Sequence, residues 1–241
     1  MRLDVFLSEK GFAISRTEAK NLITGGAVTV MGKCVTKPSF DVNPELSDIT
    51  VDLSMKKYVS RGGLKLEGAL SAFEINPSDR LAIDIGASSG GFTDCLLQNG
   101  AAHVIAVDSG CGQLVESIRC DERVTVFENY NARYMKASDF EYAPNLAVMD
   151  VSFISATYII PAIYEILAEG GDFICLIKPQ FEVGRRGLSK GGIVKSERER
   201  LDAVKKVTDF AAAQGFISLG TVTSPIQGGD GNIEYLAHFK K

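Results

Sequence analysis

The chain has 241 residues, of which 26 are basic and 30 acidic, so its formal net charge at pH 7 is -4. This length suits one large or two unequal domains, and a hydrophobic fraction of 45% is enough to bury a core. The acidic balance excludes a uniformly basic nucleic-acid-binding protein, although a basic patch can form on an acidic chain.

Cysteine and histidine usage predicts a cytoplasmic protein without a metal ion. The five cysteines form no Cys-x-x-Cys pair, and only two histidines are present, so no zinc site is expected. An odd number of cysteines without a secretion signal is typical of reduced cytosolic thiols. The uncharged and largely apolar stretch Val151–Tyr164 is shorter than the ~18 apolar residues of a membrane span. We interpret it as a buried helix.

Residues 1–53 are predicted to form a small α+β module. Apolar residues recur at helical spacing from Leu3, and Gly11 can end this first helix. The capping box Ser15-Arg-Thr-Glu18 predicts the start of a second helix, which Gly25-Gly26 ends.

Two strands are predicted after these helices. Alternating Val28 and Val30 indicate the first strand, Gly32-Lys33 indicates a turn, and a return strand is expected to begin at Val35. Residues 54–62 are then predicted to be a linker, and a short helix through Phe73 is expected after the Gly62-Gly63 pair.

From residue 81 onward, predicted strands alternate with predicted helices. The strands are expected at 81–85, 103–107, 124–127, 146–150, 172–177, 217–223 and 233–239. The clearest helices are expected at 91–99, 113–119, 153–168 and 196–214. Nearly continuous apolar strands between amphipathic helices indicate an α/β fold, with a doubly wound, Rossmann-like and mostly parallel sheet over residues 63–241.

A glycine-rich turn follows the first strand of this sheet. Gly86, Gly90 and Gly91 have the spacing Gly-x-x-x-Gly-Gly, which differs from the dinucleotide-binding Gly-x-Gly-x-x-Gly. Glycines allow positive φ and the close approach of a ligand to the backbone. With Asp84 two residues earlier, the pattern fits a site for the amino group of a methionine moiety, as in S-adenosylmethionine-dependent methyltransferases. A turn whose glycines serve packing alone is the alternative.

Charged residues end four of the predicted strands, namely Asp84, Asp108, Asp150 and Lys178. Ligands of open parallel sheets bind at the carboxyl ends of the strands, so these side chains are candidate site residues. Asp108 lies about 20 residues after the glycine turn, where a carboxylate can accept both hydroxyls of an adenosine ribose. Its alternative role is to cap its own loop. Asn131 is a candidate for the adenine end, although Asn in a turn often bonds to its own backbone.

Three candidate residues have weaker local signals. Lys178 is followed by Pro179, which favours extended backbone and fixes the lysine at a strand end. Glu234 falls on the last predicted strand, and alone it would be an edge-strand charge. Lys65 lies on the short helix before the sheet, and alone it would be a surface lysine.

Together, Lys65, Asp150, Lys178 and Glu234 resemble the Lys-Asp-Lys-Glu tetrad of the FtsJ-type ribose 2'-O-methyltransferases. The segments Val-Ser-Arg-Gly-Gly-Leu-Lys-Leu, Asp-Ser-Gly-Cys-Gly-Gln-Leu, Met-Asp-Val-Ser-Phe-Ile-Ser, Lys-Pro-Gln-Phe-Glu-Val-Gly and Gly-Asn-Ile-Glu-Tyr resemble signatures of the TlyA family, historically called haemolysins. This resemblance implies methylation of ribosomal RNA at cytidine, with S-adenosylmethionine as cofactor. The implied cofactor-binding residues are Asp84, Gly86, Ala87, Ser88, Gly90, Gly91, Phe92, Asp108, Asn131 and Asp150.

Residues 1–53 resemble an RNA-binding domain found in a small-subunit ribosomal protein, in some tRNA synthetases and in pseudouridine synthases. The resemblance and the charge pattern give the candidate RNA contacts Arg2, Arg16, Lys20, Lys33 and Lys37. A second basic patch follows Lys178 and contributes Arg185, Arg186 and Lys190, with a solvated loop as its alternative reading.

Methyl transfer to a ribose hydroxyl is an in-line displacement, so the protein must align the reacting atoms and manage one proton. Because neither His103 nor His238 is well placed, Lys178 is the candidate base, with the other three tetrad residues positioning it and the ribose. A cationic clamp formed by both lysines is the alternative. Two other functions are alternatives: a non-catalytic RNA-binding or ribosome-assembly factor, and a membrane-active haemolysin. The second is disfavoured because no spanning segment or strongly basic amphipathic helix is predicted.

Overall fold

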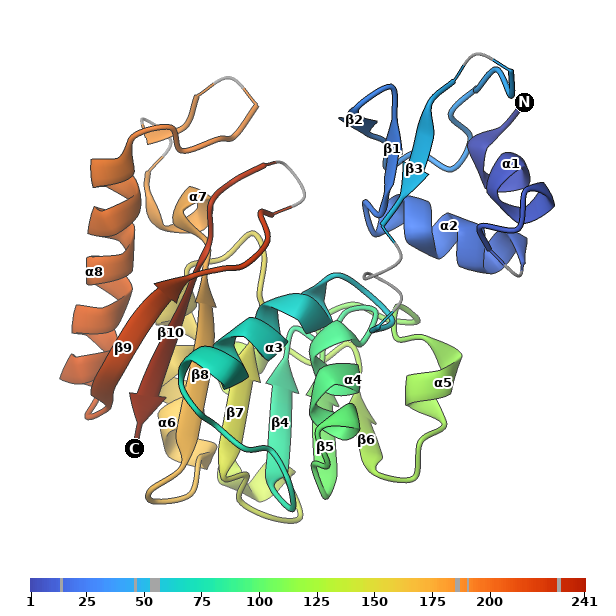
Figure 1. The fold of residues 1–241 in the computed structure, drawn as a ribbon. Coiled ribbons are helices and arrows are strands. Elements are labelled where there is room, and N and C mark those ends of the chain that lie inside the picture. Colours follow the sequence, from blue (N-terminus) through green and yellow to red (C-terminus); the bar gives the residue numbers. More distant parts are fainter. Residues whose placement is uncertain (14, 46, 53–56, 185–186, 190, 229–230) are drawn as a thin grey trace. The chain divides into compact units, whose positions relative to one another are not determined.

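The computed structural model describes residues 1–13, 15–45, 47–52, 57–184, 187–189, 191–228 and 231–241. The chain folds into two compact units, Met1–Gly63 and Leu64–Lys241. Figure 1 shows the helices and strands of each unit. The two units are described separately.

The first unit packs two helices with a three-stranded antiparallel sheet of order β2-β1-β3. Its elements are α1 (Leu3–Glu9), α2 (Arg16–Thr24), β1 (Val28–Val30), β2 (Lys33–Cys34) and β3 (Ile49–Val51). The Ser15 hydroxyl accepts a hydrogen bond from the Glu18 backbone N–H at 3.1 Å, and so caps α2 as its sequence predicts. The apolar faces of both helices bury residues that include Leu3, Leu7 and Ile23 against β1.

Two details of this unit differ from the sequence-based expectation. The return strand β2 begins at Lys33 rather than at Val35. Met31 and Gly32 both have positive φ (50° and 72°) and form a two-residue turn, so pairing with β1 restarts at Lys33. The strand β3 was not predicted, because its three residues are too few for a clear alternation.

The second unit contains a seven-stranded sheet of order β6-β5-β4-β7-β8-β10-β9. Its strands are β4 (Leu81–Ile85), β5 (His103–Val107), β6 (Val124–Phe127), β7 (Leu146–Met149), β8 (Asp172–Ile177), β9 (Ile217–Thr223) and β10 (Tyr235–Lys240). Strands β4 to β8 pair in parallel, whereas β10 is antiparallel to both β8 and β9. The predicted Rossmann-like, mostly parallel sheet is therefore confirmed.

Helices cover both faces of this sheet (Figure 1). They are α3 (Gly62–Ala72), α4 (Gly91–Gln98), α5 (Glu116–Arg119), α6 (Ile160–Ile166), α7 (Pro179–Glu182) and α8 (Glu197–Ala213), with 3-10 turns η2 (Ala132–Tyr134), η3 (Ala137–Asp139) and η4 (Ala156–Tyr158). Helices α6 and α8 bury Ile163 and Val207 in one core with the sheet residues Ile83 and Phe173. Figure 1 shows α3 and α4 on the opposite face.

Three predicted boundaries in this unit are wrong. The helix expected at 153–168 is a loop, then η4, then α6, because Pro161 stands in the first turn of α6 and marks its start. Helix α5 begins at Glu116 instead of residue 113. Glu234 precedes β10 instead of lying on it, and β10 is flanked on both sides by other strands, so Glu234 is not an edge-strand charge.

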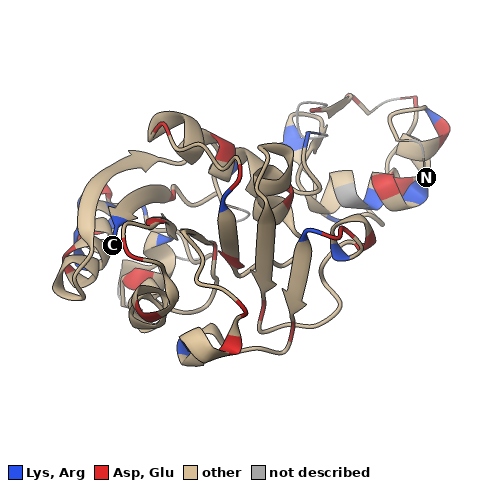
Figure 2. Cartoon of the chain, turned by 90° about the horizontal axis from the view of Figure 1, so that it is seen from below, with Lys and Arg blue, Asp and Glu red and all other residues tan. Residues whose placement is uncertain are grey.

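Charged residues lie mainly on helices and loops, and the strands of the large sheet are almost free of them (Figure 2). Helix α2 carries both signs, with Arg16 and Lys20 beside Glu18. Within the described ranges, no helix is long and apolar enough to cross a membrane. Among the same residues, no group of three or more His, Cys, Asp or Glu side chains could hold a metal ion.

Candidate active site

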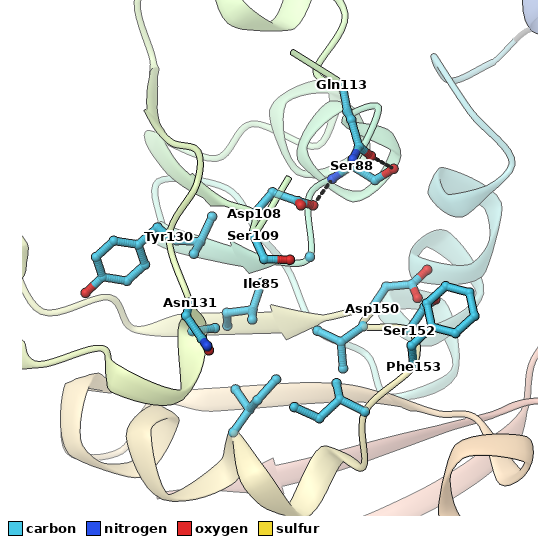
Figure 3. A pocket seen from close by; sticks show the side chains of 16 residues that line it. Ile85, Ser88, Asp108, Ser109, Gln113, Tyr130, Asn131, Asp150, Ser152 and Phe153 are labelled. Atoms are coloured by element: carbon cyan, nitrogen blue, oxygen red, sulfur yellow. Dashed lines mark hydrogen bonds between the residues drawn. The ribbon is translucent and has the colours of Figure 1, made fainter. Parts of the chain in front are cut away.

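A cavity of about 460 Å³ opens at the carboxyl ends of β4, β5 and β7. Strand β4 lies between β5 and β7, so the strand order reverses here, and this is where open α/β sheets bind ligands. The cavity is lined by Ile85, Gly86, Ser88, Val107, Asp108, Ser109, Gln113, Tyr130, Asn131, Ala132, Asp150, Val151, Ser152, Phe153, Ile154 and Ile159. In Figure 3, Tyr130 and Asn131 lie at one end of the cavity and Asp150, Ser152 and Phe153 at the other.

The turn after β4 requires glycine at two positions. Gly86 has φ 87°, and an added Cβ there would overlap the backbone oxygen of Asp150. Gly90 has φ 96° at the start of α4, and an added Cβ would lie 2.9 Å from the side chain of Leu114. The backbone of this turn can therefore approach both a ligand and β7 closely.

Asp108 lines the cavity and also caps its own loop. Its two carboxylate oxygens accept hydrogen bonds from the backbone N–H groups of Ser88 and Gly110, both at 2.7 Å. Each oxygen still has a lone pair available for a ligand hydroxyl. Asn131 likewise lines the cavity while its side chain accepts a hydrogen bond from the Arg133 N–H at 3.1 Å.

Asp84 is fully buried beside the turn and does not line the cavity. One carboxyl oxygen accepts a hydrogen bond from the Thr93 hydroxyl at 2.6 Å, and the other has no hydrogen-bond partner among the described residues. Burial raises the pKa of Asp84 to about 7, although the hydrogen bond from Thr93 acts to lower this pKa. The negative charges of Asp150 and Asp108 raise it further. Four other predicted cofactor residues, Ala87, Gly90, Gly91 and Phe92, are also buried and outside the cavity lining.

The structure brings together four charged side chains that are far apart in the sequence. The ammonium of Lys178 lies 2.6 Å from a carboxylate oxygen of Asp150 and donates a hydrogen bond to the Ser152 hydroxyl at 2.7 Å. The ammonium of Lys65 donates to Glu234 at 2.6 Å and lies 3.9 Å from Asp150. Among the described residues, two cations and two anions thus form one cluster without net charge beside the cavity. Asp150 belongs both to this cluster and to the cavity lining.

The sheet topology explains this convergence. Asp150 follows β7, and Lys178 follows β8 at the same edge. Because β10 is antiparallel to β8, with Tyr235 opposite Ile177, the residue before β10 arrives beside the residue after β8. Glu234 therefore lies at the edge that carries Lys178. Lys65 comes from the first turn of α3 and is only 8% exposed, so it is not a surface lysine.

Comparisons with known proteins identify the family. Residues 58–241 match the FtsJ-like methyltransferase family, and residues 1–47 match the S4 domain. The chain belongs to the FtsJ-like methyltransferase family. It is 43% identical to hemolysin A of Brachyspira hyodysenteriae over 99% of both chains. It is 42% identical to the 16S/23S rRNA (cytidine-2'-O)-methyltransferase TlyA of Mycobacterium tuberculosis, over 97% of this chain and 87% of that one.

A solved structure agrees with this assignment. A protein from Streptococcus thermophilus, provisionally named a hemolysin, has a TM-score of 0.80 and 45% identity, covering 100% of this chain and 88% of that one. S-adenosylmethionine is the cofactor of the FtsJ-like domain. The cavity fits it: its volume suits a small-molecule ligand, Ile85, Val107 and Ile154 offer apolar walls, and Asp108 offers a carboxylate for ribose hydroxyls.

Sequence reasoning missed several side chains of this site. Ser152 binds Lys178, and Gln180 donates to the second carboxylate oxygen of Glu234 at 3.5 Å. Phe153 is 92% exposed at the cavity mouth, has φ 64°, and its ring centroid lies 5.3 Å from that of Phe181. The segments around Asp150 and Lys178 resemble family signatures, but nothing in their residue types indicates these roles.

In the S4 domain, Arg2 and Arg16 share one buried carboxylate. Arg2 donates two hydrogen bonds to Asp4 at 2.9 Å, and Arg16 donates one at 3.2 Å, while both arginine side chains stay at least half exposed. The other candidate RNA contacts of this domain, Lys20, Lys33 and Lys37, are exposed. Three further candidates, Arg185, Arg186 and Lys190, lie outside the described residues.

Proposed function

We propose that this protein transfers the methyl group of S-adenosylmethionine to the ribose 2'-hydroxyl of a cytidine in ribosomal RNA, in the cytoplasm. The relative from Mycobacterium tuberculosis at 42% identity is named a 16S/23S rRNA (cytidine-2'-O)-methyltransferase. This chain combines an FtsJ-like methyltransferase domain with an S4 domain. The observation that carries the proposal is the cluster of two lysines and two carboxylates that borders the donor cavity through Asp150.

Lys178 is proposed as the residue that orients and deprotonates the 2'-hydroxyl. When bound, S-adenosylmethionine supplies an electrophilic methyl group, so the remaining task is to align the hydroxyl and remove its proton. Asp150 and Ser152 hold the Lys178 amino group, which takes up the hydroxyl proton as the neutral amine and so becomes the ammonium. Lys65 and Glu234 position the ribose from the other side of Asp150. If both lysines instead stay charged as clamps, the methyl-transfer rate plotted against pH will show no ionisation at neutral or basic pH.

The proposed cofactor contacts divide into two groups. Gly86, Ser88, Asp108, Asn131 and Asp150 line the cavity and would contact the cofactor, with Asp108 accepting its ribose hydroxyls. The residues Asp84, Ala87, Gly90, Gly91 and Phe92 would shape the turn from behind. We further propose residues 1–53 as the RNA-binding domain, 54–62 as the linker and 63–241 as the catalytic domain.

RNA affinity is proposed to come from phosphate contacts of the S4 domain. Arg2 and Arg16 present guanidinium groups fixed by Asp4, and Lys20, Lys33 and Lys37 add exposed charge. Arg185, Arg186 and Lys190, which lie outside the described residues, are proposed as further RNA contacts.

Isolated ribosomal subunits and S-adenosylmethionine with a labelled methyl group test the proposal. We expect the wild-type protein to label ribosomal RNA, and mapping of the alkali-resistant position to give a cytidine ribose. The matched control is Lys178→Ala, which should bind cofactor but transfer no label. A wild-type protein that binds subunits without transferring label would be an assembly factor, and label on a base would contradict the proposed chemistry.

A further inference from the structure

Two segments of the FtsJ-like domain carry the proposed chemistry and contact each other at three points. Residues 150–156 follow β7, and residues 178–182 follow β8. At one end of this contact, Lys178 binds Asp150 and Ser152. In the middle, the ring of Phe181 packs against that of Phe153.

Glu182 makes the contact at the other end. Its side chain is 2% exposed, and its carboxylate receives three hydrogen bonds from side chains and backbone that the structure describes. The Ser155 hydroxyl donates at 2.6 Å, the Ala156 backbone N–H donates at 2.7 Å, and the Lys206 ammonium from α8 donates at 2.9 Å. Both carboxylate oxygens are therefore used, and the buried charge is balanced by one lysine.

The loop that Glu182 holds forms one wall of the donor cavity. Its first five residues, 150–154, all line the cavity. Within it Phe153 has φ 64°, a conformation that costs a bulky aromatic residue free energy and persists only where the surroundings fix it. Lys178 fixes this loop before Phe153, and Glu182 fixes it at Ser155 and Ala156, after Phe153.

We infer that Glu182 is a positioning residue for methyl transfer: its carboxylate sets the distance between the wall of the donor cavity and Lys178. This inference rests on the proposed function. Glu182 does not line the cavity, so it acts through the 150–156 loop. An in-line displacement is sensitive to such spacing, because a misplacement of about 1 Å can cost about a hundredfold in rate.

Three variants separate positioning from stability. Glu182→Gln keeps the size of the side chain but weakens its bonds to Ser155 and Ala156. Ser155→Ala removes one of these bonds, together with the hydrogen bond from the Thr157 backbone N–H that caps η4, and leaves the ion pair with Lys206. Lys206→Met, the matched control, removes the ion pair with α8 and leaves both bonds to the loop. For each variant of the full chain, kcat, the KM values for subunits and S-adenosylmethionine, and the melting temperature are measured.

We expect Glu182→Gln to lower kcat by about ten- to a hundredfold and Ser155→Ala by a smaller factor, with the KM for subunits within about twofold of wild type. Lys206→Met should lower the melting temperature while kcat stays near the wild-type value. A purely structural role predicts instead that melting temperatures fall and kcat per folded molecule is unchanged in all three variants, and this result overturns the inference.

Failure of the inference and failure of the proposed function give different results. A wild-type protein that labels RNA, with Glu182→Gln equally fast, refutes the inference alone. A wild-type protein that labels no RNA refutes the proposed function and the inference with it. If Glu182→Gln does not fold, Ser155→Ala decides: a lower kcat at an unchanged melting temperature supports positioning, and an unchanged kcat refutes it.

Discussion

Replacement of Asp84 by Asn should change how the stability of the FtsJ-like domain depends on pH. Burial raises the pKa of this carboxyl from 3.8 to about 7 in the folded protein. Between pH 4 and 7 the folded protein therefore keeps a proton that the unfolded chain has lost. Stability consequently falls as the pH rises through this range and changes no further above it.

The expected size follows from the same displacement. At ~1.4 kcal/mol per pH unit, the raised pKa of Asp84 lowers the free energy of unfolding by at most about 4 kcal/mol between pH 4 and pH 8. Between pH 5 and pH 8 the loss is about 3 kcal/mol. The asparagine side chain of the variant would still accept the hydrogen bond from Thr93, but its amide N–H groups would lack partners in the buried site, at a cost of about 1–3 kcal/mol. That cost is independent of pH, so the two proteins are compared by how steeply their unfolding free energies change with pH.

Urea unfolding at pH 5, 6, 7 and 8, followed by circular dichroism because the chain contains no tryptophan, measures this slope. Each curve is fitted with separate transitions where the two units unfold independently. We expect the difference in unfolding free energy, Asp84→Asn minus wild type, to increase by about 3 kcal/mol from pH 5 to pH 8. Parallel pH dependences of the two proteins would refute the reasoning about burial.

Three further predictions concern the catalytic and RNA-binding residues. Lys178→Ala should lose methyl transfer but bind S-adenosylmethionine within a few-fold of wild type by calorimetry; normal turnover would disprove the assignment. Replacing Lys33 and Lys37 by Ala should weaken subunit binding at low salt and reduce the slope of log affinity against log salt by between about 1 and 2; an unchanged slope would show that neither contacts phosphate. The hydrogen bond from Arg2, helped by Arg16, holds the pKa of Asp4 well below its usual range despite burial. The ionised Asp4 carboxylate therefore stabilises the folded S4 domain above about pH 4, and this stabilisation is lost as the pH falls further. Asp4→Asn should cost about 1–3 kcal/mol near neutrality and remove this acid sensitivity, both visible in urea unfolding of the S4 domain.

The strands of the large sheet could be predicted from the sequence because each is a short apolar run between turn residues. The bounds of β4, β5, β6, β8 and β9 match the expected ranges. The same signal failed between residues 151 and 168, because an apolar run does not reveal where a buried loop ends and a helix begins. There the loop conformation is set by hydrogen bonds from Ser155 and Ala156 to Glu182, a residue 26 positions away from Ala156.

The candidate site was predictable to the extent that it follows from parallel strands. Asp108, Asp150 and Lys178 could be placed at one edge because parallel strands end together. Lys65 and Glu234 needed the family resemblance, since their approach depends on the packing of α3 and on the antiparallel insertion of β10. Ser152 and Gln180 could not be found, because short-range loop geometry brings them to the lysine and the glutamate.

The burial of the four-residue cluster decides how its variants are interpreted. Among the described residues, removing Lys65 would leave Glu234, 2% exposed, without a cation, so much of the resulting loss would reflect an unpaired buried charge. Removing Lys178 leaves Asp150 with Lys65 3.9 Å away, and Asp150 is more exposed than Glu234. A loss of activity in Lys178→Ala is therefore the better measure of chemistry, whereas a loss in a Lys65 or Glu234 variant measures the integrity of the cluster as well.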